Sequence, residues 1–223
     1  MSDPLEASRP TSVPFRWIPV RSLAERHRDR VLSHLLALEP GDRYLRFGYG
    51  ASDSQIERYV ERLDFDRDEI FGVFNRRLEL IAMAHLAYLP EFDGESDTAE
   101  FGVSVATQAR GRGYGSHLFD HAVLHARNRG VDTMIIHALS ENTAMLRIVR
   151  KAGARVERDG GEAEARLKLP PESIASHVEA LVETQAAEFD YRMKSNSQRM
   201  DMLRSFFASM RTGMGKARVD RME

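Results

Sequence analysis

A glycine-rich stretch at residues 108–115, QARGRGYG, has the residue types that bind phosphate groups. A strand-like run precedes it at 100–105 (EFGVSV), and a helix-like run follows it at 116–129. This order leaves the first backbone N–H groups of the helix unpaired, so that they can hold phosphate oxygens. Glycines let a pyrophosphate approach the backbone, and Arg110 and Arg112 add positive charge there.

The spacing of the glycines excludes two common nucleotide-binding patterns. No Gly-Lys-Ser/Thr follows, and the sixth position of a G-x-G-x-x-G pattern is Ser116 or Leu118, depending on the starting glycine. The pattern that fits is Arg110-x-x-Gly113-x-Gly115. Taken alone it is weak evidence, because an ordinary turn that starts a helix has the same composition.

A second motif follows the glycine loop in the chain. A β-rich run at 131–139 leads to Asn142, a helix-like segment and Lys151-Ala152-Gly153-Ala154. With the glycine loop, this resembles the GNAT superfamily of N-acyltransferases over residues 15–169. The segments RYLRF (43–47), RLDFDRDEI (62–70), AEFGVSV (99–105) and ENTAML (141–146) are similar to the acetyltransferase domain of bacterial Pat-type protein lysine acetyltransferases.

The resemblance implies acetyl-CoA as co-substrate. The strand backbone would pair with the pantetheine arm, the glycine loop would hold the pyrophosphate, and Asn142 would reach the pantetheine. The residues that it assigns to the cofactor are Val103, Val105, Arg110, Gly111, Arg112, Gly113, Tyr114, Gly115, Ser116 and Asn142.

The attacking amine must lose a proton, and Pat-type enzymes place their general base in the segment that matches Glu100. We therefore predict a partly buried Glu100 as the base, with His85 as the substitute. A rim carboxylate and an ordinary strand histidine are the alternatives. Many members of the superfamily place a tyrosine, as acid for the leaving thiolate, where this chain has Val149. Either no side chain supplies that proton, or another one such as Tyr114 does.

Carboxylates are dense before the predicted catalytic strand, at Glu91, Asp93, Glu95, Asp97 and Glu100. They favour a cationic acceptor, although a solvated loop has the same composition. The expected function is direct acetyl transfer to a primary amine, most simply a protein lysine. A polyamine or aminoglycoside acetyltransferase and a non-catalytic acyl-CoA-binding regulator are the alternatives.

Two patterns suggest a metal, and neither is sufficient. Asp64-x-Asp66-x-Asp68 lacks the glycine and the final glutamate of a calcium loop, so a solvated acidic loop is the better interpretation. His117, His121 and His125 share one helical face, but no further ligand is obliged to join them. We expect no metal.

Composition limits the remaining possibilities. A net charge of −2 does not favour nucleic-acid binding, and no apolar run is long enough for a membrane span. The absence of cysteine excludes disulfides and a cysteinyl acyl-enzyme. Residues 1–14 lack the features of a signal peptide and are expected to be a disordered leader of a cytoplasmic protein.

The hydrophobic pattern predicts an α/β domain at 15–170 with a mixed, mostly antiparallel sheet flanked by helices. We expect a first strand at 15–20, a helix from Ser22 to Leu38 that ends at Pro40, and a helix capped by Ser52 or Asp53. Hairpins are expected at 70–89 and 155–169. The expected apolar stripe of the first helix is Leu23, His27, Val31, Leu35 and Leu38.

A C-terminal extension at 171–223 begins after Pro170-Pro171 and is helical in character. An acidic first half and a basic second half would suit antiparallel pairing of two copies. A homodimer through these helices is therefore predicted, with packing of the extension on its own domain, or a basic tail that contacts nucleic acid or an acidic protein, as the alternatives.

Overall fold

The computed structural model describes residues 18–89 and 98–170. The predicted leader, the acids at 91–97 and the C-terminal extension lie outside the described residues. Their predicted roles, including self-association, remain predictions.

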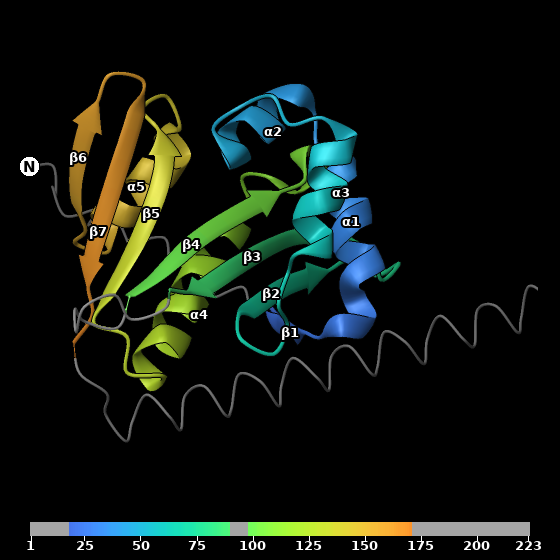
Figure 1. Ribbon diagram of the computed structural model, residues 1–223, viewed down its shortest axis with the longest axis horizontal. Helices are drawn as coiled ribbons and strands as arrows, with labels where there is room; N and C mark the ends of the chain where they lie inside the picture. The colour runs from blue at the N-terminus through green and yellow to red at the C-terminus, as the bar shows by residue number, and fades with distance from the viewer. Residues whose placement is uncertain (1–17, 90–97, 171–223) are drawn as a thin grey trace, which may run out of the picture.

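A seven-stranded sheet in the order β1-β2-β3-β4-β5-β7-β6 forms the centre of the described chain (Figure 1). All neighbouring strands are antiparallel except β4 and β5, which run parallel. The predicted mixed, mostly antiparallel sheet is therefore confirmed. The strands are β1 (Arg21–Leu23), β2 (Glu69–Phe74), β3 (Leu80–Tyr88), β4 (Thr98–Val105), β5 (Thr133–Leu139), β6 (Arg155–Asp159) and β7 (Glu162–Lys168).

Helices cover both faces of this sheet. On one face α4 (Tyr114–Asn128) contacts β2, β3 and β4, and α5 (Thr143–Lys151) contacts β6 and β7. On the other face α1 (Arg28–Leu36) contacts β3 and α3 (Asp53–Glu61). The short helix α2 (Pro40–Phe47) contacts both β4 and β5, so it lies across the boundary between the two halves of the sheet.

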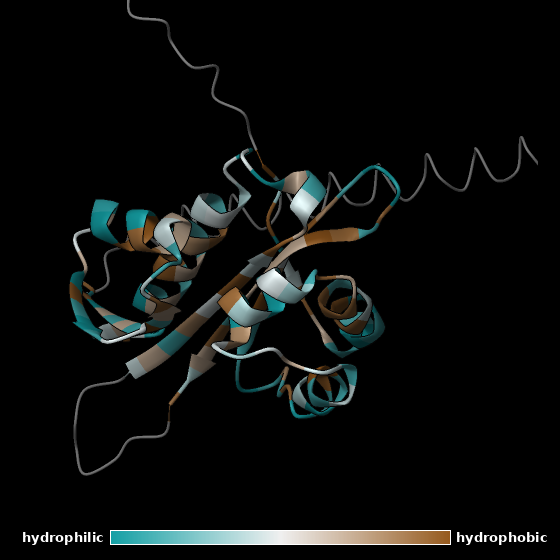
Figure 2. Ribbon diagram, turned by 90° about the horizontal axis from the view of Figure 1, so that it is seen from above, coloured by the Kyte–Doolittle hydropathy of each residue, from teal (hydrophilic) through white to brown (hydrophobic). Residues whose placement is uncertain are grey.

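Two apolar cores follow from the alternation of side chains along the strands. In β2, Phe71 and Val73 pack in the α4 core, whereas Ile70 and Phe74 pack in the core beneath α1 and α3. Phe101 of β4 meets Phe119 of α4 edge-to-face at 5.3 Å. Figure 2 shows the apolar residues gathered in the central strands. No helix of the described residues is long and apolar enough to cross a membrane.

The N-terminal segment differs from the prediction. The first strand is Arg21–Leu23, because this segment pairs with β2, whereas Ile18 and Val20 are buried without forming a strand. Ser22 therefore lies in β1, and α1 begins later, at Arg28, after a 3-10 turn at Glu25–His27. All five residues of the predicted stripe are buried, but they do not lie along one helix: Leu23 is in β1, His27 is in the 3-10 turn and Leu38 follows α1, so that only Val31 and Leu35 belong to α1.

Pro40 begins α2 instead of only ending the preceding helix. Proline is well tolerated in the first turn, where its missing N–H would have had no helical partner. Arg43 fixes this helix, because its guanidinium donates to the carbonyl oxygens of Leu36 and Leu38 and pairs with Asp53 at 2.6 Å. Ser52 caps α3 as predicted.

His34 joins α1 to the sheet from a buried position. Its Nδ1 lies 3.0 Å from the Leu80 carbonyl oxygen, and its Nε2 lies 2.8 Å from Oγ of Ser104. A neutral ring satisfies both contacts, with Nδ1 donating and Nε2 accepting. Burial lowers the pKa of His34 to about 4.

We expect this histidine to make the fold acid-labile. The unfolded chain takes up the proton near pH 6.5 but the folded chain only near pH 4, so stability is full above pH 6.5 and falls as the pH drops through this window. The gap corresponds to roughly 3 kcal/mol at most. His34→Gln should flatten the dependence of Tm on pH between 6.5 and 4. A residual slope should remain from His27, because burial also lowers the pKa of that histidine to about 4.

Exposed His137 provides the matched control, and His137→Gln should keep the wild-type slope. If His34→Gln retains the wild-type slope, the acid lability has another source.

Candidate active site

The two parallel strands β4 and β5 pair over only three positions, from Thr98 opposite Thr133 to Glu100 opposite Ile135. Beyond Glu100 the strands separate (Figure 1). β4 stays paired with β3 and β5 with β7, so the backbone of residues 101–105 has an edge without a ladder partner on the β5 side. An extended ligand can hydrogen-bond to such an edge as an added strand. The predicted pantetheine-binding residues Val103 and Val105 lie on it.

A cavity of about 400 Å³ runs from this edge to the glycine loop. It is lined by every residue predicted to bind the cofactor except Arg112, together with residues of α2 and α5. The structure thus brings the strand, the loop and Asn142 to one groove, although they are far apart in the chain.

The glycine loop presents open backbone to this groove. Gly113 is the N-cap of α4 with φ of +83°, and Gly111 has φ of +70°, so both have the left-handed conformation that glycine favours. No side chain caps the helix at Gly113. The first N–H groups of the 15-residue helix α4 are therefore available to an anionic ligand, and a pyrophosphate fits this loop.

Arg110 has a partner that the sequence did not indicate. Its guanidinium pairs with the buried carboxylate of Asp42 in α2, and Thr107 Oγ1 donates to the same carboxylate at 3.0 Å. Asp42 therefore joins α2 to the loop, and the positive charge of Arg110 is partly neutralised before any phosphate arrives. Arg112 is exposed. A pyrophosphate role for either arginine stays a prediction.

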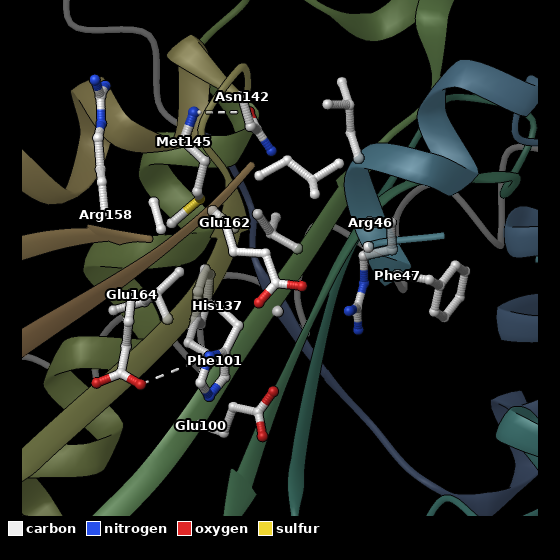
Figure 3. Close-up of a pocket in the computed structure, with 18 of the residues that line it drawn as sticks. Arg46, Phe47, Glu100, Phe101, His137, Asn142, Met145, Arg158, Glu162 and Glu164 are labelled. Atoms are coloured by element: carbon white, nitrogen blue, oxygen red, sulfur yellow. Dashed lines mark hydrogen bonds and ion pairs between the residues drawn. The ribbon is translucent and has the colours of Figure 1, made fainter. Parts of the chain in front are cut away.

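A second cavity, of about 830 Å³, opens on the other side of the β4–β5 separation (Figure 3). Its lining includes five carboxylates and three guanidinium groups, from Glu100, Glu157, Asp159, Glu162, Glu164, Arg46, Arg158 and Arg166. Arg166 is paired with Glu164. The excess of carboxylates favours a cationic ligand in this cavity.

Glu100 lies on β4 in the wall of this larger cavity (Figure 3). It is exposed, not partly buried as expected from the sequence. The side chains of a strand alternate, so Glu100, Gly102 and Ser104 face the side of the sheet covered by α1, α2 and α3. Exposure leaves the carboxylate accessible to a substrate or a water molecule.

His85, the substitute base, lies within a hydrogen-bonded chain beside the cavity. Its Nε2 is 2.9 Å from Oδ2 of Asp68, and its Nδ1 is 2.9 Å from the Tyr59 hydroxyl. The same hydroxyl receives a hydrogen bond from Nη2 of Arg46 at 2.9 Å. Both ring nitrogens are thus engaged, and His85 would reach a substrate proton only through its partners.

The buried end of this chain is anchored by charge. Burial would raise the pKa of Asp68, but hydrogen bonds from His85 and Arg67 outweigh it and hold that pKa well below its usual range. Asp68 is therefore an ionised acceptor in the fold, and the prediction of a solvated acidic loop was wrong for this residue. Burial also raises the pKa of Tyr59, which keeps its hydroxyl protonated.

Residues 35–154 match the model of the Acetyltransferase (GNAT) family. The chain belongs to this family. It is accordingly an acetyl-CoA-dependent N-acetyltransferase, as the glycine loop and the Asn142 motif predicted.

Solved structures similar to this GNAT chain confirm its fold. The GNAT domain of PAT from S. lividans is 22% identical, with a TM-score of 0.57 over 67% of this chain and 89% of that one. YncA from Salmonella typhimurium, solved with its cofactor acetyl-CoA, is 16% identical, with a TM-score of 0.54 over 71% of this chain and 97% of that one. Ribosomal-protein-alanine N-acetyltransferase from Brucella melitensis is 18% identical, with a TM-score of 0.52 over 67% of this chain and 99% of that one. No curated protein matches the chain.

Asn142 lines both cavities of this GNAT domain. Its Oδ1 accepts from the Met145 N–H at 3.1 Å and caps α5. Its amide nitrogen is the atom left to meet a cofactor, and Figure 3 shows it directed toward the cavity.

Neither Val149 nor Tyr114 offers an obvious acid for the leaving thiolate. Val149 is fully buried in the α4 core, so the position of the superfamily tyrosine offers no polar group. Tyr114 is 8% exposed at the first position of α4 and lines the smaller cavity.

Two of the three histidines on the predicted face of α4 pack against β2. His121 and His125 both meet Phe71 edge-on, and Nδ1 of His125 lies 2.7 Å from Glu69. In residues 18–89 and 98–170 no group of three or more histidine or carboxylate side chains is arranged to hold a metal.

Sequence reasoning missed Asp42, Arg46 and Tyr59 as residues of the site. Arg46 belongs to the RYLRF segment and Tyr59 was assigned to a core stripe, so their types and segments were visible. Their convergence on β4 was not.

Proposed function

We propose that this GNAT enzyme acetylates the side-chain amine of lysine in a protein. The observation that carries the proposal is the larger cavity, which is wide, open and rich in carboxylates next to the exposed Glu100. A lysine side chain is long enough to enter such a cavity while its protein remains outside. The similarity of four segments to Pat-type enzymes, and of the fold to the GNAT domain of S. lividans PAT, supports the same acceptor.

The transfer follows from the placement of the groups. Acetyl-CoA supplies a thioester, with its pantetheine along the open edge of β4 and its pyrophosphate at the N-terminus of α4. Glu100 removes a proton from the lysine ammonium, directly or through water, and the free amine attacks the thioester carbon. The carbon–nitrogen bond forms, the carbon–sulfur bond breaks, CoA leaves as a thiolate, and the excess proton on the nitrogen passes through water to that thiolate. The thiol of CoA resembles free cysteine, with a pKa of about 8.5, so it can leave without a protein acid.

A small polycation is the competing acceptor, because spermidine or an aminoglycoside would also be attracted to the five carboxylates. The length of the lysine side chain and the Pat-like segments favour a protein.

Release of CoA from acetyl-CoA, measured with a thiol reagent, tests the acceptor. We expect turnover with a lysine peptide blocked at its N-terminus, and none with the same peptide carrying Nε-acetyl-lysine. Spermidine and an aminoglycoside are assayed in parallel at equal concentration. Faster turnover with either of them than with lysine peptides or an intact protein acceptor would contradict the proposal. Cofactor binding without transfer to any amine would favour the regulatory alternative.

A further inference from the structure

Arg46 of α2 lies where the two cavities meet. Five residues line both cavities, namely Leu45, Arg46, Val103, Asn142 and Met145, and Arg46 is the only charged one. A thioester must reach this junction, because it links a cofactor in the smaller cavity to an amine in the larger one. A guanidinium group therefore lies beside the expected position of the reacting carbon.

The strand beneath Arg46 is shaped to receive it. A Cβ built on Gly102 would lie 2.6 Å from Nη1 of Arg46 and 2.7 Å from Cζ, so only glycine allows the guanidinium to rest on β4. The rings of Phe47 and Tyr59 flank the group, with Cζ 5.2 and 5.6 Å from their centroids. The guanidinium is thus held on several sides in one place.

This cation lacks a counter-ion within the described part of the chain. The Arg46 guanidinium donates a hydrogen bond to the neutral Tyr59 hydroxyl. Within residues 18–89 and 98–170, no carboxylate lies within ion-pairing distance of this guanidinium. Arg43 of the same helix and Arg110 of the smaller cavity each have a carboxylate partner. Partly burying an unpaired charge costs free energy, so an anionic group of a bound molecule at this position would be stabilised by the guanidinium.

The chain behind Tyr59 orients the arginine. Ionised Asp68 accepts from Nε2 of His85, which leaves Nδ1 to accept from the Tyr59 hydroxyl. The Tyr59 oxygen is then free to accept from Arg46. Each donor has one acceptor in this arrangement, so the positive charge is fixed before the reaction starts, as efficient electrostatic stabilisation requires.

The surroundings indicate which anion this is. Five carboxylates line the larger cavity and disfavour a substrate carboxylate there. The N-terminus of α4, where phosphate groups fit, begins at Tyr114 at the other end of the smaller cavity. What remains is the charge that appears on the thioester oxygen during the reaction.

We propose that Arg46 is a catalytic residue that stabilises the negative charge developing on the acyl group during transfer. As the amine nitrogen bonds to the carbonyl carbon, the carbonyl electron pair moves to oxygen, where the guanidinium offsets its charge. The pair then returns, the carbon–sulfur bond breaks and sulfur leaves with its electrons, and the excess proton on the nitrogen passes through water to the departing thiolate, because Glu100 already holds the first proton. The proposal rests on acetyl transfer at this site but not on lysine being the acceptor. It supplies electrostatic assistance in a site where the family's tyrosine position holds buried Val149.

Arg46→Gln tests the proposal, with kcat measured for a lysine peptide and for water, whose attack hydrolyses acetyl-CoA. Losing one donor to an oxyanion should lower both rates by about 10²–10³-fold. The affinity for acetyl-CoA, measured by calorimetry, and the KM for the peptide should stay unchanged. Arg46→Lys should recover part of the rate because it keeps the charge. Arg58→Gln, at an exposed arginine of the neighbouring helix α3, should behave as wild type.

Several results would overturn this role. An unchanged kcat with a raised KM for the peptide would make Arg46 an acceptor-binding residue, and weaker acetyl-CoA binding alone would make it a cofactor-binding one. If Arg46→Gln does not fold, Arg46→Lys and Tyr59→Phe decide, and unchanged kcat in both would reject the proposal. Absent peptide transfer with hydrolysis still dependent on Arg46 would reject only the lysine acceptor.

Discussion

Replacing Glu100 by glutamine should lower the rate of acetyl transfer by about 10²–10⁴-fold, the usual contribution of a general base. The substitution keeps the size of the side chain but removes its ability to take a proton. The affinity for acetyl-CoA should stay nearly unchanged, because the loop that fits the pyrophosphate lies at the other end of β4. Steady-state kinetics with a lysine peptide, together with calorimetric titration of acetyl-CoA, measure the two quantities.

The residual rate gives a second and sharper criterion. Without the base, attack depends on amine that is already deprotonated, so the rate of Glu100→Gln should rise with pH. An acceptor amine of lower pKa should suffer less from the substitution for the same reason. Glu57→Gln, at an exposed glutamate of α3, is the matched control. If Glu100→Gln transfers as fast as wild type, Glu100 is a rim carboxylate, and proton removal through Tyr59 and His85 becomes the next hypothesis.

Gly113→Val should weaken acetyl-CoA binding by about 10- to 100-fold, since a non-glycine residue in this conformation costs about 1–3 kcal/mol and the loop must shift to relieve it. Gly113 has φ of +83° and starts α4, so any shift moves the N–H groups that fit the pyrophosphate. Calorimetric titration of acetyl-CoA against the folded variant is the measurement.

Gly153→Val separates this effect from general backbone strain. Gly153 has φ of +86° and open space around it, but it lines neither cavity. Its substitution should lower Tm while leaving the affinity for acetyl-CoA unchanged. Equal affinity of Gly113→Val and wild type would remove the glycine loop from the cofactor site.

The sequence by itself determined the parts of this enzyme that depend on local order. The glycine loop between a strand and a helix, the Asn142 motif and the apolar runs of β2 and β3 each lie within a few consecutive residues. Backbone geometry alone converts such patterns into elements. The family and its cofactor were therefore readable without coordinates, and so was the mixed sheet.

Local signals were less reliable at the N-terminal boundary. Ile18 and Val20 are buried as a strand pattern suggests, but hydrogen bonding to β2 begins only at Arg21, and apolar periodicity reports burial rather than pairing. Pro40 could either end one helix or begin the next, and the polar anchors of Arg43 decide that a second helix forms.

The tertiary structure alone decided which polar residues meet. Asp68 looked like part of a solvated acidic loop, yet the register of β3 places His85 beside it and opposite Gly102 of β4. The missing side chain of Gly102 then admits Arg46 from α2, and α3 supplies Tyr59 between them. No periodicity links five segments so far apart in the chain, because their contacts depend on strand register and helix packing, which are fixed only when the whole core forms.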